Sequence, residues 1–379
     1  MLSRFVGVYR TAFPLYSETF ISGQIHSFSK FSPVVICRDP VGPINNFDVV
    51  TLTCRFKFFE KLFFTAFGVS GFFDNENLLK KLNLIHAHFA PDAVLALSLA
   101  NRLKIPLVAT CHGSDVMVSD GYLLMSGLLT NLRYLAMRGK LMRETSLFIA
   151  VSKFLRNSMI ARGYPEDKVI THYIGVDTTR FMPLATSQRC ISGGEYILSV
   201  ARHTDVKGLD LLFRAFSRVH QLHPNFRLIQ IGGGELTQNL TKLVNELGIN
   251  DCVEFLGPQP PSEVLRYLQS CKALVLSSRQ SSSGAEEAFG LVLAEASACG
   301  VPCIGTNIGG IPEAVMHGET GLIVEPENAE MLADTICYLL EDNHLAERLG
   351  KRGREMIMDC FDLKKQTKKL ENIYEGILA

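Results

Sequence analysis

Short apolar runs alternate with helix-forming stretches twice along this chain, and that alternation limits the folds it can adopt. Runs such as residues 4–9 and 196–200 are typical of buried strands, and each is followed by a loop and a helix pattern. Strand–helix alternation favours a parallel sheet covered by helices. We therefore predict an α/β protein with two Rossmann-like domains that face each other across a cleft.

Length and composition place the domain boundaries. A chain of 379 residues is too long for one simple core. Residues 182–194 form a linker rich in proline, serine and glycine, which ends in Gly193 and Gly194. We predict an N-terminal domain over residues 1–185, a C-terminal domain over residues 186–360 and a final helix over residues 361–379.

The two halves of the chain carry opposite charge, although the whole chain is neutral. Residues 1–185 hold 20 Lys and Arg against 13 Asp and Glu, a net charge of +7, and residues 186–379 carry −7. A basic first half suits an anionic partner such as a phosphate-linked molecule, a membrane surface or a nucleic acid. No nucleic-acid-binding motif is found and the acidic half would be repelled, so we expect no nucleic-acid partner.

Two segments of the first half suit a membrane surface. Residues 55–73 contain eight Phe, and four Phe recur at helical spacing: Phe56, Phe59, Phe63 and Phe67. Residues 121–143 contain four cations and no acidic residue: Arg133, Arg138, Lys140 and Arg143. The alternatives are a helix packed in the core for the first segment and a solvated helix face for the second.

The strongest chemical motif lies within residues 284–325. Glu287 and Glu295 are separated by seven residues, and Gly290 stands between them at the start of a helix pattern. A helix N-terminus offers N–H groups and a positive dipole to a diphosphate, and Gly290 lets the backbone approach it. Each carboxylate accepts two hydroxyl groups, so one suits a sugar ring and the other a ribose. The alternative is an ordinary helix start with acidic residues in its first turn.

Two further loops follow predicted strands, where α/β sheets bind ligands. His112 opens the sequence HGSD (112–115), and an imidazole there can bind a sugar hydroxyl. Arg202 and Lys207 share one loop, where two cations would neutralise a diphosphate. Taken alone, His112 is better explained as a histidine in a turn, and a solvated basic turn is the alternative for Arg202 and Lys207.

The remaining polar positions carry weaker signals. Ser17 and Glu18 begin a predicted helix with Ser17 as N-cap, which indicates either a place in the cleft or an ordinary capped helix. His86 and His88 alternate on a strand and so share a face, but no third metal ligand is evident. Residues 232–235 (GGGE) depart from the pattern G-x-G-x-x-G, which argues against a dinucleotide dehydrogenase.

Together these motifs closely resemble those of retaining glycosyltransferase family 4, which has the GT-B fold with a C-terminal helix that crosses back to the first domain. The resemblance covers most of the chain and rests on four segments: residues 284–325, HGSD, the R…KG loop at 202–208 and HYIGVDTTRF at 172–181. The segment FPLYSETFI (13–21) also looks like the opening of a branch that builds bacterial surface polysaccharides.

The resemblance implies roles for individual residues. Glu287 would face the donor sugar, and His112 would approach that sugar from the first domain. The implied donor-binding set is Arg202, Lys207, Gly233, Phe289, Gly290, Leu291 and Glu295. Ser17, Glu18 and Asp115 are assigned to the acceptor side. Glu18 receives no catalytic role, because this chain lacks the Gly-Gly loop that the family has there. Ala285 and Ala288 also depart from the family pattern, which leaves the donor sugar open.

The function implied is hexosyl transfer with retention, from a UDP- or GDP-sugar to a polyprenyl-diphosphate-linked or other saccharide, in capsule, exopolysaccharide or lipopolysaccharide synthesis. We expect no metal and no cofactor, since no Asp-x-Asp motif is present. Scattered cysteines and the absence of a signal peptide predict a cytoplasmic protein, free or peripheral on the inner face of the plasma membrane. The alternatives are another GT-B enzyme (an epimerase or a glucan synthase) and a non-catalytic nucleotide-sugar-binding partner.

Overall fold

The computed structural model describes residues 4–15, 18–44, 47–52, 57–68, 73–184 and 195–379, with residues 57–59 described by their backbone alone. The chain divides into two compact units, residues 1–175 with 363–379, and residues 176–362. The first boundary precedes the linker singled out in the sequence because Val176 N–H donates to the Phe361 carbonyl at 2.8 Å. Residues after Gly175 therefore belong to the second unit.

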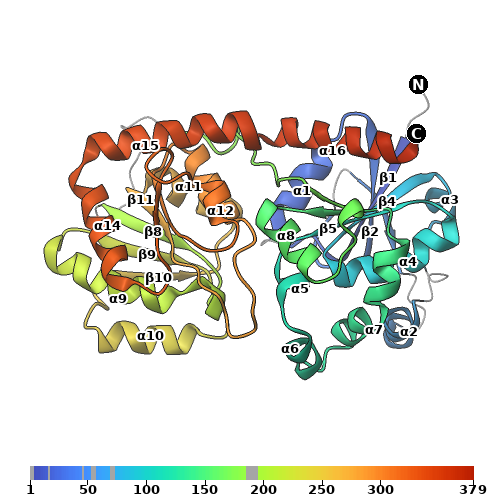
Figure 1. Ribbon diagram of the computed structural model, residues 1–379, viewed down its shortest axis with the longest axis horizontal. Coiled ribbons are helices and arrows are strands. Elements are labelled where there is room, and N and C mark those ends of the chain that lie inside the picture. The colour runs from blue at the N-terminus through green and yellow to red at the C-terminus, as the bar shows by residue number, and fades with distance from the viewer. Residues whose placement is uncertain (1–3, 16–17, 45–46, 53–56, 69–72, 185–194) are drawn as a thin grey trace. The chain divides into compact units, whose positions relative to one another are not determined.

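The described part of the first unit forms a seven-stranded parallel sheet with the order β3-β2-β1-β4-β5-β6-β7 (Figure 1). Its strands are apolar along most of their length, as in any parallel sheet that helices cover on both faces. They are β1 (Arg4–Phe13), β2 (Phe31–Pro40), β3 (Asp48–Thr51), β4 (Leu82–His88), β5 (Leu107–Cys111), β6 (Leu147–Ala150) and β7 (Val169–Thr171).

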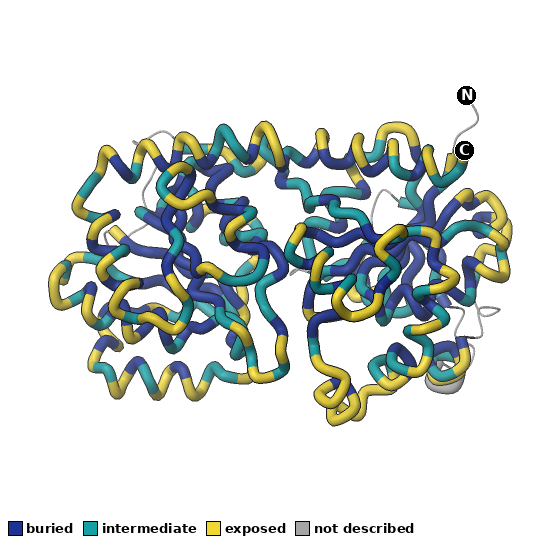
Figure 2. The backbone as a smooth tube through the Cα atoms, viewed as in Figure 1, coloured by how far each residue is buried: buried dark blue, intermediate teal, exposed yellow. Residues whose placement is uncertain are grey.

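Figure 2 shows that the strands of this sheet are largely buried, while the helices around them alternate between buried and exposed residues. Helix α4 (Ala90–Leu103) buries most of its length against β4 and β5, which fits its run of Ala, Val and Leu. The other helices of the unit are α1 (Thr19–His26), α2 (Lys57–Phe67), α3 (Glu76–Leu79), α5 (Ser114–Met117), α6 (Asp120–Met125), α7 (Leu129–Glu144), α8 (Lys153–Ala161) and α16 (Leu363–Leu378).

The second unit repeats the architecture. Its described strands form a six-stranded parallel sheet with the order β10-β9-β8-β11-β12-β13. The strands are β8 (Tyr196–Val200), β9 (Arg227–Ile231), β10 (Val253–Gly257), β11 (Ala273–Leu276), β12 (Cys303–Thr306) and β13 (Leu322–Val324). The helices are α9 (Leu209–Leu222), α10 (Thr237–Glu246), α11 (Pro261–Ser270), α12 (Leu291–Ala298), α13 (Ile311–Ala314), α14 (Ala329–Glu341) and α15 (Asn343–Met356), and a π-helical turn follows at Ile357–Phe361.

Both sheets contain a topological switch point. The chain leaves β1 toward one side of its sheet and returns to the other side with β4, and β8 and β11 are related in the same way. In open α/β sheets, ligands bind at such a point, outside the carboxyl ends of the strands. We call this edge of each sheet the carboxyl edge. The predicted pair of Rossmann-like α/β folds is confirmed.

Helix α16 belongs to the first unit, as the fold prediction expects, and a buried carboxylate holds it there. The Glu371 side chain is fully buried and accepts backbone N–H groups of Ser29 at 2.8 Å, Lys30 at 2.6 Å and Phe31 at 3.2 Å. It also accepts the Ser29 hydroxyl at 2.8 Å. Hydrogen bonds to a charged, desolvated acceptor are the strong ones, so Glu371 fixes α16 beside the start of β2.

The Phe-rich helix α2 exposes the described part of its predicted stripe. Phe63 and Phe67 are 48% and 71% exposed, whereas Phe64, which lies off that stripe, is fully buried. Phe56 lies outside the described residues, and the side chain of Phe59 is not described. The described part of the stripe, Phe63 and Phe67, is therefore a surface feature, and Phe64 attaches the helix to the core.

The basic surface predicted over residues 121–143 needs a correction. Arg133 is buried, and its Nη1 donates to the Thr65 carbonyl at 3.1 Å. Arg138 pairs with Asp120 at 2.7 Å. Arg133 therefore joins α7 to α2 instead of facing solvent, and the charge of Arg138 is largely compensated.

Glu371→Ala should lower the free energy of unfolding by about 3 kcal/mol, because three backbone N–H groups and one hydroxyl lose their acceptor together. Glu375→Ala, one turn further along α16, is the matched control. Its side chain is 39% exposed and pairs with Lys30, so its removal should cost less than about 1 kcal/mol. Urea unfolding of both variants measures the difference. Equal effects would show that Glu371 does not anchor the helix.

Candidate active site

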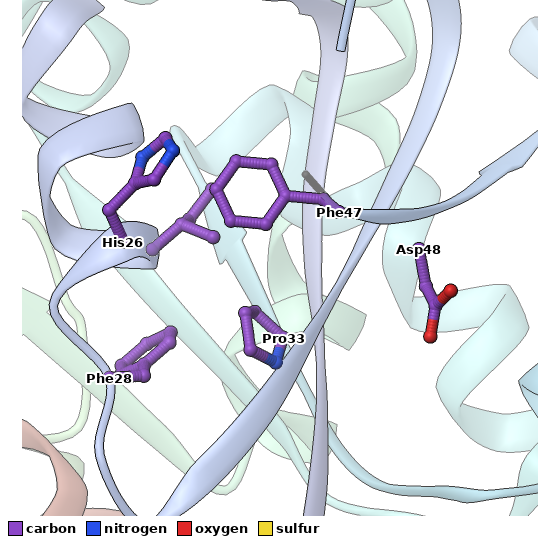
Figure 3. Close-up of a pocket in the computed structure, with 6 residues that line it drawn as sticks. His26, Phe28, Pro33, Phe47 and Asp48 are labelled. Atoms are coloured by element: carbon purple, nitrogen blue, oxygen red, sulfur yellow. The ribbon is translucent and has the colours of Figure 1, made fainter. Parts of the chain in front are cut away.

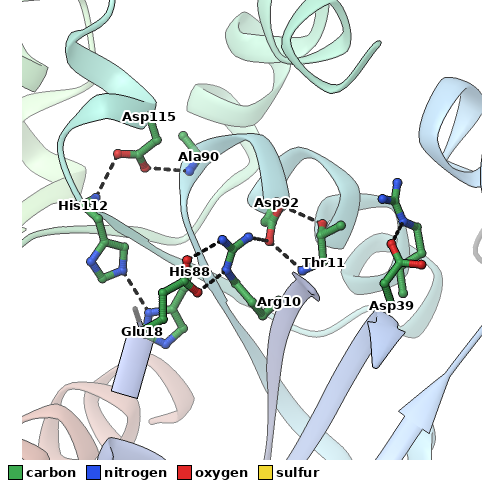
Figure 4. A network of polar contacts seen from close by, with 10 residues as sticks. Arg10, Thr11, Glu18, Asp39, His88, Ala90, Asp92, His112 and Asp115 are labelled. Atoms are coloured by element: carbon green, nitrogen blue, oxygen red, sulfur yellow. Dashed lines mark hydrogen bonds and ion pairs between the residues drawn. The ribbon is translucent and has the colours of Figure 1, made fainter. Parts of the chain in front are cut away.

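An arginine at the carboxyl edge of the first sheet organises the residues around it (Figure 4). Arg10 Nε and Nη2 donate to the two carboxylate oxygens of Glu18 at 2.8 and 2.7 Å, and Nη1 donates to Asp92 at 2.6 Å. Asp92 also accepts the N–H and the hydroxyl of Thr11, each at 2.7 Å. The guanidinium lies 4.3 Å from the centre of the Phe89 ring. These contacts join the end of β1 to the starts of α1 and α4.

This network determines what Glu18 can do. Burial alone would lower the pKa of Arg10, but the hydrogen bonds and charges of Glu18 and Asp92 raise it, so the guanidinium stays charged. Both oxygens of Glu18 are engaged with Arg10, which makes Glu18 a structural partner of Arg10. Ser17 lies outside the described residues, and α1 begins at Thr19 with Glu18 in the capping position.

Three histidines form a row of nearly parallel rings from the sheet to the loop after β5. The His86 and His88 rings stack with centroids 4.5 Å apart, and His88 and His112 lie 5.3 Å apart. A hydrogen bond of 3.1 Å joins His88 Nδ1 to His112 Nε2. His86 is fixed at both nitrogens, by Thr110 Oγ1 at 2.6 Å and by the Tyr374 hydroxyl. The shared face predicted for His86 and His88 is therefore present.

Packing keeps these histidines neutral. Burial lowers the pKa of His86 and of His112 to about 3, and it lowers the pKa of His88 well below its usual range. The nearby charge of Arg10 acts in the same direction on His88 and His112. Among the described residues, His112 Nδ1 and His88 Nε2 are buried without a hydrogen-bond partner. A neutral His112 with one unused nitrogen can bind a ligand oxygen.

Asp115 holds the His112 loop. Its Oδ1 accepts the N–H groups of His112 at 2.9 Å and Gly113 at 2.8 Å, and its Oδ2 accepts that of Ala90 at 2.8 Å. Gly113 has a φ of +119°, a backbone conformation that favours glycine. Burial raises the pKa of Asp115, although these hydrogen bonds oppose the rise. The carboxylate therefore faces the backbone and ties the loop to the start of α4.

In the second unit, an ion pair forms at the carboxyl edge. Lys207, from the loop after β8, contacts the Glu287 carboxylate, and Ser278 Oγ donates to that carboxylate at 3.2 Å. Burial alone would raise the pKa of Glu287, but the Lys207 charge and hydrogen bond, aided by Ser278 and Arg202, hold it below its usual value. Arg202 itself is exposed. The structure thus places an ionised carboxylate beside two cations.

An arginine that the sequence analysis did not single out fixes the Lys207 loop. Arg279 Nη2 contacts Asp205 at 2.8 Å and Asp210 at 3.1 Å, and its backbone N–H donates to the Val206 carbonyl at 2.9 Å. Asp205 also accepts the N–H of Ser282 at 2.9 Å. These contacts join the loop after β8 to the segment that precedes Glu287. Acidic and basic residues flanking both loops were visible in the sequence, but their pairing was not.

Glycines hold the backbone around Glu287. Gly310 N–H donates to the Glu287 carbonyl at 2.8 Å, and a Cβ on Gly309 would lie 2.0 Å from that carbonyl oxygen. Gly290 caps α12 with a φ of +83°. Phe289 is buried, and Leu291 is the first residue of α12. The N-terminus of this helix therefore stands at the same edge as the ion pair, with its positive dipole end.

The other predicted donor-side residues flank this centre. Glu295 lies inside α12 and is half-buried, and burial raises its pKa to about 7, while Arg180 opposes the rise. Gly233 follows β9, and its carbonyl accepts the His203 N–H at 3.0 Å. The sequence analysis did not single out His203. Its two ring nitrogens form hydrogen bonds of 2.7 Å with the side chains of Gln230 and Thr237. It fixes the glycine loop to the end of β8.

Comparison with known proteins gives the family. The model for glycosyl transferases group 1 matches residues 187–356, and the model for glycosyltransferase family 4 matches residues 29–180. The N-acetyl-alpha-D-glucosaminyl L-malate synthase of Bacillus anthracis is 32% identical over 309 residues, which cover 79% of this chain and 76% of that protein. The chain belongs to glycosyltransferase family 4.

Two further comparisons agree with this assignment. The family 4 chain is 28% identical to the D-inositol 3-phosphate glycosyltransferase of Frankia alni over 361 residues, 88% of this chain and 83% of that protein. The crystal structure of Anabaena HepE in complex with UDP and glucose has a similar fold, with a TM-score of 0.79 and 18% sequence identity. The matched region covers 98% of this chain and 100% of the HepE chain. The fold is that of the GT-B glycosyltransferases, as the sequence predicted.

Other features of this family 4 glycosyltransferase lie apart from the two carboxyl edges. A pocket opens at the amino ends of β2 and β3 and contains none of the predicted site residues (Figure 3). Its lining residues are Ile25, His26, Phe28, Pro33, Phe47 and Asp48.

Within the described ranges, no group of three or more His, Cys, Asp or Glu could hold a metal ion. No helix in those ranges is long and apolar enough to cross a membrane.

The shielded histidines should make the family 4 enzyme sensitive to acid. Burial lowers the pKa of His172 to about 4, and those of His86 and His112 to about 3. In the unfolded chain these groups gain protons near pH 6.5, so the unfolded state binds more protons below that pH. We expect the free energy of unfolding to fall between pH 6.5 and pH 4, by about 1.4 kcal/mol per pH unit for each histidine.

Urea unfolding at several pH values tests this expectation. His172→Leu should reduce the slope of this decline by about 1.4 kcal/mol per pH unit, the contribution of one proton. If His172→Leu and wild type lose stability with the same slope, the histidines are not the cause of the acid sensitivity.

Proposed function

We propose that this glycosyltransferase moves a hexose from a nucleoside diphosphate sugar to a saccharide acceptor with retention of anomeric configuration. The observation that carries the proposal is the arrangement at the carboxyl edge of the second sheet. There the Lys207 ammonium, the ionised Glu287 carboxylate and the N-terminus of α12 come together at the switch point between β8 and β11. The likeness of the fold to HepE, solved with UDP and glucose, supports this choice of ligand.

The chemistry requires charge stabilisation on the leaving group. Negative charge grows on the diphosphate as its bond to the sugar breaks, and the sugar becomes oxocarbenium-like. Arg202, Lys207 and the first turn of α12 supply positive charge for that diphosphate. Glu287, whose lowered pKa keeps it ionised, can bind sugar hydroxyls and support the positive sugar. Retention follows if the leaving phosphate accepts the proton of the incoming hydroxyl on the same face.

We assign the acceptor to the first unit and infer a saccharide linked to polyprenyl diphosphate. Residues 1–185 carry a net charge of +7, which suits a diphosphate. The names of two relatives contain L-malate and inositol 3-phosphate, both of which are anions. A product of this kind fits the synthesis of capsule, exopolysaccharide or lipopolysaccharide. The neutral His112 is the residue of this unit that we assign to the reaction itself.

We further propose a cytoplasmic enzyme that is peripheral on the inner membrane face, held there by apolar contact. Helices α2 and α6 each pack against α7 in the first unit. Large apolar side chains that are 38% to 88% exposed gather on them and on the turn before α7: Leu62, Phe63, Phe67, Tyr122, Leu124, Met125, Leu128, Leu129 and Leu132. Exposed apolar clusters of this kind commonly mark interaction sites.

A panel of UDP-, GDP- and ADP-sugars, scored by thermal stabilisation, tests the donor site. A ligand at 100 times its Kd should stabilise the fold by roughly 2.7 kcal/mol. The effect should be larger at pH 8 than at pH 6, because a Glu295 with a pKa of about 7 accepts ribose hydroxyls best when ionised. Glu295→Gln should remove both the shift and its pH dependence.

Glu286→Gln is the matched control, because Glu286 binds Gln280 at 2.8 Å and lies outside the proposed site. Its response should equal that of wild type. A nucleotide-sugar shift without transfer to any saccharide would favour a non-catalytic binding partner. Where transfer occurs, the anomeric proton coupling of the product tests retention, and an inverted product would exclude the mechanism above.

Sedimentation with anionic liposomes tests the membrane surface. The triple variant Phe63→Ser, Phe67→Ser and Met125→Ser should bind at least about tenfold more weakly, since each apolar side chain removed from water contributes about 1.5–3 kcal/mol. Leu222→Ser, at an exposed apolar position of the second unit, is the control and should bind like wild type. Unchanged binding by the triple variant would show that α2 and α6 do not meet the bilayer.

A further inference from the structure

The row of histidines in the first unit contains an arrangement that packing alone does not explain. His88 is 1% exposed, and its Nε2 has no hydrogen-bond partner among the described residues. A buried polar atom without a partner costs free energy, and an apolar residue at this position would avoid that cost. What His88 does provide is the 3.1 Å hydrogen bond from its Nδ1 to His112 Nε2.

The position of His88 is itself well determined. Strand β4 places it on the same face as His86, and the two rings stack at an interplanar angle of 28°. His86 cannot turn freely, because Thr110 and Tyr374 hold its two nitrogens. The stacked His86 therefore limits the rotation of the His88 ring, and His88 in turn limits the rotation of His112.

We propose that His88 is a positioning residue that holds His112 in one orientation and in the tautomer protonated on Nδ1. The inference rests on the role that the proposed function gives to His112. It adds a residue to the reaction that neither the sequence motifs nor the comparisons assign.

The tautomer follows from where an unshared N–H costs least. If His88 Nδ1–H donates to His112 Nε2, the N–H without an acceptor lies on His112 Nδ1. If His112 Nε2–H donates instead, that N–H lies on His88 Nε2. His88 is almost completely enclosed by protein, whereas the His112 residue is only partly buried. Both of these nitrogens are buried, but His88 lies within strand β4, whereas His112 lies in the loop after β5. The first arrangement is therefore favoured, because a loop residue can present its unshared N–H to a ligand oxygen.

This arrangement gives His112 a defined chemical character. Its Nε2 is occupied as an acceptor, and Nδ1–H remains as a donor for an oxygen that the protein does not supply. A fixed neutral donor suits a sugar hydroxyl or another ligand oxygen. It also avoids a cation beside Arg10, whose own charge is already matched by Glu18 and Asp92.

Selective ¹⁵N labelling of histidine tests the tautomer directly in the full chain, without any substrate. The His112 signals, assigned by their loss in His112→Asn, should show protonation on Nδ1 in wild type. His88→Leu should remove this preference and give a mixture of the two tautomers. A His112 signal protonated on Nε2 in wild type, or one that is unchanged in His88→Leu, would overturn the proposal.

Kinetics provide the second arm. His88→Asn keeps a polar atom close to the Nδ1 position, whereas His88→Gln carries the same amide one methylene further out. We expect kcat to fall roughly tenfold or more in His88→Gln and less in His88→Asn, with the donor KM changed by less than about twofold. Equal losses in the two variants, or a loss confined to KM, would contradict a positioning role. The Asn and Gln pair keeps this arm decisive if His88→Leu does not fold.

His172→Leu is the matched control, because His172 is a buried histidine of the same unit whose Nε2 is also without a partner. It should change neither the His112 signals nor kcat. The tautomer measurement and the kinetics distinguish a failure of the role proposed for His88 from a failure of the proposed glycosyl transfer. Failure to find any glycosyl transfer would leave the tautomer measurement intact, and an altered tautomer result would leave the donor-binding panel intact.

Discussion

Parallel pairing of strands is the constraint on which both halves of this protein depend. It places the carboxyl ends of neighbouring strands at one edge, so the loops that follow them are brought together whatever their separation in sequence. Arg10 in β1, His88 at the end of β4 and His112 after β5 meet in this way. Lys207 and Glu287 meet after β8 and β11, although 80 residues separate them.

The two edges are built with different electrostatics. At the first sheet, the charge of Arg10 is compensated by Glu18 and Asp92. The histidines beside this network are neutral because they are desolvated. At the second sheet, Arg202 is exposed and the Glu287 carboxylate stays ionised beside Lys207. A diphosphate suits the second environment, and an uncharged hydroxyl suits the first. The proposed division of donor and acceptor between the units rests on this contrast.

The sequence revealed most where one segment determines its own structure. Apolar runs located the strands, and the helix pattern from Leu291 placed Glu287 before a helix and Glu295 within it. The sequence did not reveal which segments contact one another. Helical spacing groups Phe63 with Phe67, but whether that stripe or Phe64 faces the core depends on neighbouring helices. Arg133 was expected at the surface for the same reason, and the pairing of Arg279 with Asp205 depends on the order of the strands.

Helix α16 has a consequence for how the chain acquires its structure. Leu370 and Tyr374 belong to the hydrophobic core of the first unit, together with residues of β1 and β2. The core of that unit is therefore incomplete until residues 363–379 have left the ribosome, whereas residues 176–362 are continuous in sequence and need no later segment. Domains usually fold in the order in which they are made. Here the unit that is made first finishes last, and it must keep its unfinished surface from aggregating while the other unit folds.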